Sequence, residues 1–111
     1  LHPGLPSFPG YDLARSQMRG YASLFGFRLQ PRDERARHRF VDTLLQLFRL
    51  GYSWGGYESL ILPLLNHQKG NAQLRAQLGL DDDTYRICIG LEHPDDLIAV
   101  LDQALAAWAA V

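Results

Sequence analysis

The sequence contains a single cysteine and a single lysine, and each scarcity removes a class of chemistry. Cys88 has no second thiol with which to form an internal disulfide, and it cannot build a multi-cysteine zinc site. A lone cysteine also suits a reducing compartment, so we expect a cytoplasmic protein. Of the 11 basic residues all but one are arginine, which leaves Lys69 as the single lysine.

Net charge and long apolar runs are scarce as well. The 11 basic and 12 acidic residues give a formal charge of −1, which supplies no electrostatic reason to expect nucleic acid or an anionic membrane as a partner. No apolar run approaches the ~20 residues of a membrane-spanning helix. The start of the chain has neither an initiating Met nor a signal-peptide pattern, so we expect a fragment of a longer protein.

What remains is the composition of one ordinary domain. Hydrophobic residues make up 47% of the 111 positions and charged residues 21%. We therefore expect residues 1–111 to form a single domain, in which 1–20 are a connector and a short helix. The three prolines and two glycines of residues 1–10 predict extended chain, and 12–18 predict the helix.

Hydrophobic periodicity predicts the other elements. Apolar residues alternate at period two over 23–29 and 84–90, which is typical of strands, and they recur at helical spacing over 36–48 and in a stripe of Leu97, Leu101, Leu105 and Trp108. Shorter strands are predicted over 48–52 and 57–62, and a helical turn over 72–78 within the loop-rich stretch 63–83. This order predicts an α+β fold, a two-layer sandwich with a mainly antiparallel sheet and helices on one face.

Arg86 is the most suggestive residue for function. It lies within an apolar strand, on the face opposite Tyr85 and Ile87, where a guanidinium needs a partner. The planar guanidinium matches a carboxylate in two-bond geometry. The alternatives are a structural ion pair or contact with water at a sheet edge.

The segment Tyr-Ser-Trp-Gly-Gly-Tyr-Glu-Ser at 52–59 is the second candidate. Its glycines allow close approach of the backbone to a ligand, and the alternative is a tight turn whose aromatic side chains fill the core. Other groups indicate no site. The histidines (His2, His38, His67 and His93) lack metal-ligand spacing, and the aspartates at 81–83 predict a solvated turn.

The residues at 52–62, YSWGGYESLIL, resemble the signature segment of bacterial cystathionine β-lyases, members of the Cys/Met metabolism pyridoxal-phosphate-dependent enzyme family. Residues 1–10 are similar to the segment that enters the C-terminal domain of these enzymes, and residues 85–98 and 101–105 are similar to its closing strand and helix. The resemblance implies fold-type I architecture. There a large domain, missing from this chain, binds pyridoxal 5'-phosphate through a lysine, and the small C-terminal domain closes over the substrate.

The resemblance also implies roles for individual residues. Arg86 would hold the α-carboxylate of cystathionine or a related thioether amino acid, assisted by Ser53, Trp54 and Tyr52. Ser53 would also position the catalytic lysine, which is absent from this chain, because Lys69 matches no catalytic position. We therefore expect the isolated chain to be inactive and the parent enzyme to be a homotetramer.

The choice among relatives depends on two positions. Cystathionine γ-synthases and γ-lyases typically carry a Glu-Ser-Leu-Gly-Gly version of the segment, and Tyr52 and Trp54 replace its Glu and Leu here. Loss of an acid that would recognise a distal substrate group favours the β-lyase, which yields homocysteine, pyruvate and ammonia in methionine biosynthesis. The alternatives are a γ-lyase, a γ-synthase, a homoserine sulfhydrylase, or a non-catalytic interaction domain.

Overall fold

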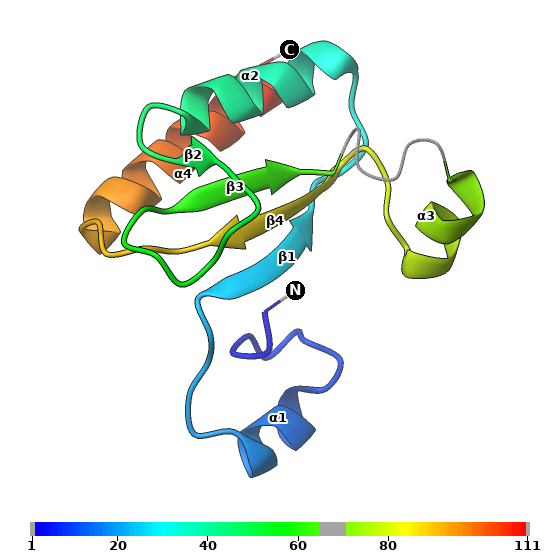
Figure 1. Cartoon of the computed structure of the whole chain (residues 1–111), viewed down its shortest axis with the longest axis vertical. Coiled ribbons are helices and arrows are strands. Elements are labelled where there is room, and N and C mark those ends of the chain that lie inside the picture. Colours follow the sequence, from blue (N-terminus) through cyan, green and yellow to red (C-terminus); the bar gives the residue numbers. More distant parts are fainter. Residues whose placement is uncertain (1, 65–70, 111) are drawn as a thin grey trace.

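A four-stranded sheet organises the part of the chain that the computed structural model describes, residues 2–64 and 71–110 (Figure 1). The elements in chain order are α1 (Tyr11–Gln17), β1 (Leu24–Arg28), α2 (Glu34–Leu44), β2 (Arg49–Leu50), β3 (Leu60–Pro63), α3 (Ala72–Leu78), β4 (Thr84–Cys88) and α4 (Pro94–Ala109). The strands lie in the order β1-β4-β3-β2. β4 is antiparallel to both of its neighbours, and β2 is parallel to β3. The predicted α+β sandwich is confirmed.

Helices α2 and α4 pack side by side over one face of the sheet, and the core lies between these layers (Figure 1). Burial of each large apolar side chain there contributes about 1.5–3 kcal/mol. The α4 stripe differs from the predicted one, because Val100 and Ala104 face the core while Leu105 is exposed. The buried cluster consists of Phe40, Leu44, Phe48, Ile61, Tyr85, Ile87, Leu97, Val100 and Ala104.

Side chains just outside the helices define where they begin and end. Asp33 accepts a hydrogen bond from the backbone N–H of Ala36 at 2.9 Å, which caps the start of α2. Arg32, beside it, donates to the carbonyls of Trp108 and Ala109 at 2.7 and 2.9 Å and so satisfies the end of α4. None of the helices in the described ranges combines the length and hydropathy that crossing a bilayer requires.

The proline-rich start forms consecutive turns rather than the predicted extended chain. Backbone N–H groups of Leu5, Phe8 and Tyr11 donate to the carbonyls three residues earlier, at 3.0, 2.9 and 3.0 Å. Each turn has proline at its second position, where the fixed φ of the pyrrolidine ring favours a β-turn. A proline every third residue therefore bends this segment repeatedly. α1 follows it, as predicted, below the sheet (Figure 1).

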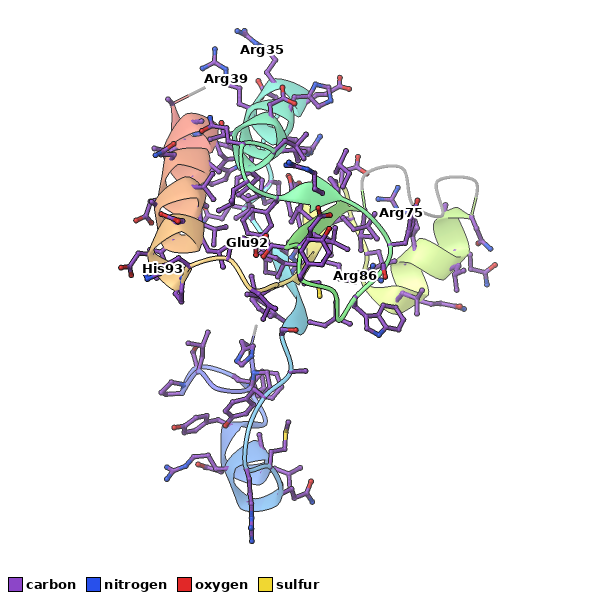
Figure 2. The ribbon with its side chains drawn as sticks, turned by 60° about the vertical axis from the view of Figure 1, so that its left-hand side comes forward. Arg35, Arg39, Arg75, Arg86, Glu92 and His93 are labelled. Atoms are coloured by element: carbon purple, nitrogen blue, oxygen red, sulfur yellow. The ribbon has the colours of Figure 1, made fainter. Side chains whose placement is uncertain are left out.

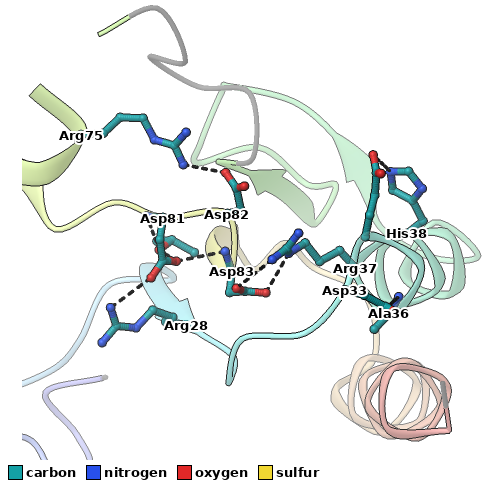
Figure 3. Close-up of polar contacts among 11 residues, drawn as sticks. Arg28, Asp33, Ala36, Arg37, His38, Arg75, Asp81, Asp82 and Asp83 are labelled. Carbon is teal, nitrogen blue, oxygen red and sulfur yellow. Dashed lines mark hydrogen bonds and ion pairs between the residues drawn. The ribbon is translucent and has the colours of Figure 1, made fainter. Parts of the chain in front are cut away.

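The three aspartates before β4 form the predicted turn, which the N–H of Thr84 closes by donating to the carbonyl of Asp81 at 3.2 Å. Each aspartate also pairs with an arginine from a different element (Figure 3). The pairs are Asp81 with Arg28 of β1 at 3.2 Å, Asp82 with Arg75 of α3 at 2.7 Å, and Asp83 with Arg37 of α2 at 2.9 Å. The last pair is shielded from water. The sequence pattern missed these pairs because the arginines of α2 and β1 are far away along the chain.

The predicted short strands differ from the observed ones around one loop. β2 covers only Arg49–Leu50, and β3 begins at Leu60 rather than at 57. Residues 51–59 leave the sheet. Gly55 within them has φ 78°, a backbone conformation that glycine adopts readily and other residues rarely adopt. We call this segment the 51–59 loop. It lies beside the sheet face that α2 and α4 leave open (Figure 2).

Candidate functional site

Arg86 projects from β4 on the face of the sheet opposite the helices. Its cross-strand neighbours are Gly26 on β1 and Leu62 on β3. Gly26 has no side chain to lie beside the arginine on the β1 side. Its flanking residues Tyr85 and Ile87 point into the core, so the predicted alternation along this strand is confirmed.

The 51–59 loop supplies the contacts of Arg86. The guanidinium donates a hydrogen bond from Nη2 to the carbonyl of Tyr52, and its central carbon lies 5.5 Å from the centre of the Trp54 ring. Among the residues that the structure describes, no acidic side chain forms an ion pair with Arg86. The alternative of a structural ion pair therefore fails for this part of the chain, and the arginine side chain is only half-buried.

The aromatic residues of the loop do not fill the core. Tyr52 is 67% exposed and Trp54 63% exposed, which contradicts the tight-turn interpretation of this segment. The loop instead contacts the sheet through its backbone, where the N–H of Gly55 lies 3.4 Å from Sγ of the buried Cys88. Ser53 lies exposed between the two aromatic residues.

This arrangement can bind a carboxylate. A guanidinium has several N–H donors in one plane, and the Tyr52 carbonyl occupies one edge of it. The Trp54 ring covers one face of the guanidinium and limits its rotation through cation–π attraction. The remaining donors are left for a planar anion. The substrate-binding roles of Ser53, Tyr52 and Trp54 stay predictions.

Sequence reasoning missed a second group of residues beside this loop. The carboxylate of Glu92 accepts hydrogen bonds from the backbone N–H of Ser59 at 2.8 Å and from its hydroxyl at 2.7 Å. The Ser59 hydroxyl in turn accepts from the N–H of Gly90 at 2.8 Å. Ser59 is fully buried. Desolvation, the largest single effect, acts to raise the pKa of Glu92. The bonds from Ser59, a backbone hydrogen bond and the charge of Arg49 together hold this pKa below its usual value.

A signal for this group was present in the sequence. Ser59 and Gly90 each adjoin an apolar strand, and small residues at such positions often allow two backbones to approach closely. No local pattern pairs them, however, because Ser59 and Glu92 are 33 positions apart.

The described residues include neither a lysine nor a candidate group of metal ligands. They include no lysine, so they hold no side-chain amine, and Lys69 lies outside them together with His67. Within the same ranges no group of His, Cys, Asp and Glu could hold a metal ion. His93 instead caps α4, accepting from the N–H of Asp95 at 3.1 Å.

Comparison with known proteins shows the family to which the chain belongs. The Cys/Met metabolism PLP-dependent enzyme family matches residues 1–106. The chain belongs to this family. A cystathionine γ-lyase of Dictyostelium discoideum is 38% identical over 95% of the chain and 27% of its own length. A cystathionine β-lyase of Lactococcus lactis is 37% identical over 94% of the chain and 27% of its own length.

The fold is shared with solved members of the family. A cystathionine γ-synthase of Xanthomonas oryzae pv. oryzae, crystallised with cystathionine, superposes with a TM-score of 0.86 at 37% identity, covering 98% of this chain and 28% of that one. The 111-residue chain therefore spans little more than a quarter of the length of these relatives. Pyridoxal phosphate is the cofactor of the family. Because relatives with different reactions match almost equally well, the reaction assignment depends on the site residues.

Proposed function

We propose that the chain is the C-terminal, substrate-closing domain of a pyridoxal-phosphate-dependent carbon–sulfur β-lyase that cleaves cystathionine to homocysteine, pyruvate and ammonia. The observation that carries the proposal is the position of Arg86, which faces away from the core, without an acidic partner in the described ranges, under the Trp54 ring. Such a guanidinium suits the α-carboxylate of an amino acid.

Arg86 would act by orientation. Bound between the guanidinium and the 51–59 loop, the α-carboxylate fixes the direction of the substrate Cα–H bond relative to the catalytic base. Pyridoxal phosphate, when bound to the rest of the enzyme, supplies the electron sink for the carbanion at Cα. We place its attachment outside this chain, because Lys69, the single lysine of the sequence, matches no catalytic position in the resemblance to the family.

Tyr52 and Trp54 support the β-lyase within the family. The Trp54 ring lies against Arg86 and the exposed Tyr52 contacts it through its carbonyl. They occupy the two positions where the γ-acting relatives typically carry Glu and Leu. An apolar surface suits the thioether chain of cystathionine. We also propose, by resemblance to the family, a cytoplasmic homotetramer acting in methionine biosynthesis.

Product analysis in the full-length, cofactor-loaded protein tests the proposal. β-cleavage of L-cystathionine releases pyruvate and homocysteine, whereas γ-cleavage releases 2-oxobutyrate and cysteine. We expect pyruvate, and we expect Arg86→Ala to lower kcat/KM by about 100-fold, since it removes the carboxylate clamp. Release of 2-oxobutyrate would assign a γ-lyase instead, and unchanged kinetics of Arg86→Ala would refute the clamp.

A further inference from the structure

The 51–59 loop is joined to the segment that follows β4 by a set of partly buried polar contacts. Beyond the bonds of Glu92 with Ser59, the N–H of Leu91 donates to the carbonyl of Tyr57 at 2.9 Å. A Cβ built on Gly90 would lie 2.3 Å from that same carbonyl oxygen, so the two backbones touch directly. On the other side, the N–H of Arg49 donates to the carbonyl of Ser59 at 3.0 Å. Ser59 therefore links β2, the end of the loop and the exit of β4.

The same loop determines how Arg86 is held. Its carbonyl at Tyr52 and its ring at Trp54 contact the guanidinium, while its base is fixed at Ser59. Glu92, which is labelled in Figure 2, lies between β4 and α4 in the chain and contacts this base through Ser59. A shift of Ser59 relative to β4 would move both contacts of Arg86 together.

An ionised carboxylate suits this position better than a neutral amide. Glu92 accepts from two donors of one residue, and a carboxylate offers only acceptors. A glutamine could accept from the Ser59 N–H, but its NH₂ group would then face a hydroxyl that already accepts from Gly90. The hydroxyl proton would lose its acceptor, and an unsatisfied buried group loosens the contact.

We propose that Glu92 is a positioning residue for substrate recognition, which fixes the 51–59 loop against β4 and so sets the orientation of the Arg86 guanidinium. This proposal rests on the proposed function of Arg86 as the carboxylate clamp. Glu92 acts through Ser59 and the loop, so its loss weakens carboxylate binding and leaves the proton-transfer chemistry in place.

A mutant cycle in the full-length, cofactor-loaded protein tests this role. The variants are Glu92→Gln, Arg86→Lys and the double variant, with Asp102→Asn as the control for loss of an exposed carboxylate on α4. With L-cystathionine as substrate, we expect Glu92→Gln to raise KM about 10-fold with a smaller change in kcat. In the Arg86→Lys background Glu92→Gln should cause little further rise in KM, because the effects of coupled residues are not additive. Asp102→Asn should keep wild-type kinetics.

Inhibition constants of the competitors L-alanine and L-alaninamide provide a second measurement. If Glu92 had only a structural role, its substitution would not change the ratio of these two constants. Wild type should prefer the carboxylate over the amide, and Glu92→Gln should narrow that preference. Unchanged KM and unchanged preference in the folded protein would overturn the proposal, and so would equal penalties in both Arg86 backgrounds. If Glu92→Gln fails to fold, Ser59→Ala removes the hydroxyl bond alone and gives the same test. Wild-type kinetics of Arg86→Lys and Arg86→Ala would overturn the proposed function itself, and the role of Glu92 with it.

Discussion

Arg37 and Asp83 form a two-bond ion pair that joins α2 to the start of β4, with Nε–Oδ1 at 2.9 Å and Nη2–Oδ2 at 3.2 Å (Figure 3). The side chain of Asp83 is 5% exposed and that of Arg37 is 18% exposed. The hydrogen bond to Asp83 raises the pKa of the Arg37 guanidinium, and desolvation lowers it. The hydrogen bond has the larger effect, so the pKa is raised. The guanidinium of Arg37 therefore stays charged.

Removing Asp83 should destabilise the domain strongly. Asp83→Ala leaves the Arg37 guanidinium poorly solvated and without its carboxylate, and breaking a buried pair in this way costs about 3 kcal/mol or more. Arg28→Ala is the matched comparison, because the pair of Arg28 with Asp81 is exposed and should contribute less than about 1 kcal/mol. Urea unfolding of the three proteins measures both values. Equal losses in the two variants would contradict the assignment of Asp83 as the buried partner.

Gly90 should tolerate no side chain. The methyl group of Gly90→Ala would meet the carbonyl oxygen of Tyr57 at 2.3 Å, which is backbone and cannot turn away. We expect a loss of about 2 kcal/mol or more in the free energy of unfolding, together with displacement of the 51–59 loop from β4. Gly20→Ala is the control, because a Cβ there meets nothing within 4 Å. Thermal unfolding and Trp54 fluorescence report the two effects, and a Gly90→Ala protein as stable as Gly20→Ala would contradict the close contact.

Most of the fold could be predicted because its signals are local. The period-two pattern around Tyr85 and Ile87 identified β4, and Pro94 identified the start of α4. The turns before α1 were missed although their prolines were recognised. The proline and glycine content of residues 1–10 was interpreted as a sign of extended chain. The spacing of Pro3, Pro6 and Pro9 instead produces the turns.

The site was predictable only in part, for the same physical reason. Arg86 stood out because a charge interrupts an apolar strand, which is a local anomaly. The contacts that orient it come from a loop more than 30 positions earlier, as do the partners of Glu92. Such contacts depend on sheet register, which no short pattern encodes. The resemblance to the family identified the loop, but not the residues that hold its base.

Acid should weaken the contact at Ser59. The pKa of Glu92 is lowered in the folded protein, below its ordinary value of 4.5, so the unfolded chain takes up a proton first as pH falls. The stability contributed by Glu92 is therefore fully present above about pH 4.5 and is lost as pH falls through the folded pKa. Melting temperatures of wild type and Glu92→Gln between pH 6 and pH 3 should converge toward the acid end. A constant difference across this range would show that the Glu92 pKa is not lowered.

The isolated 111-residue chain should have no lyase activity even when pyridoxal phosphate and L-cystathionine are supplied. The described residues hold no lysine, and Lys69, the single lysine of the whole sequence, matches no catalytic position in the resemblance to the family. Pyruvate release should stay at the rate of free pyridoxal phosphate alone, while circular dichroism confirms that the chain is folded. A Lys69→Ala variant is the control, because it should match the wild-type fragment at that background rate. Cofactor-dependent pyruvate release above background that Lys69→Ala abolishes would show that this chain carries its own catalytic lysine.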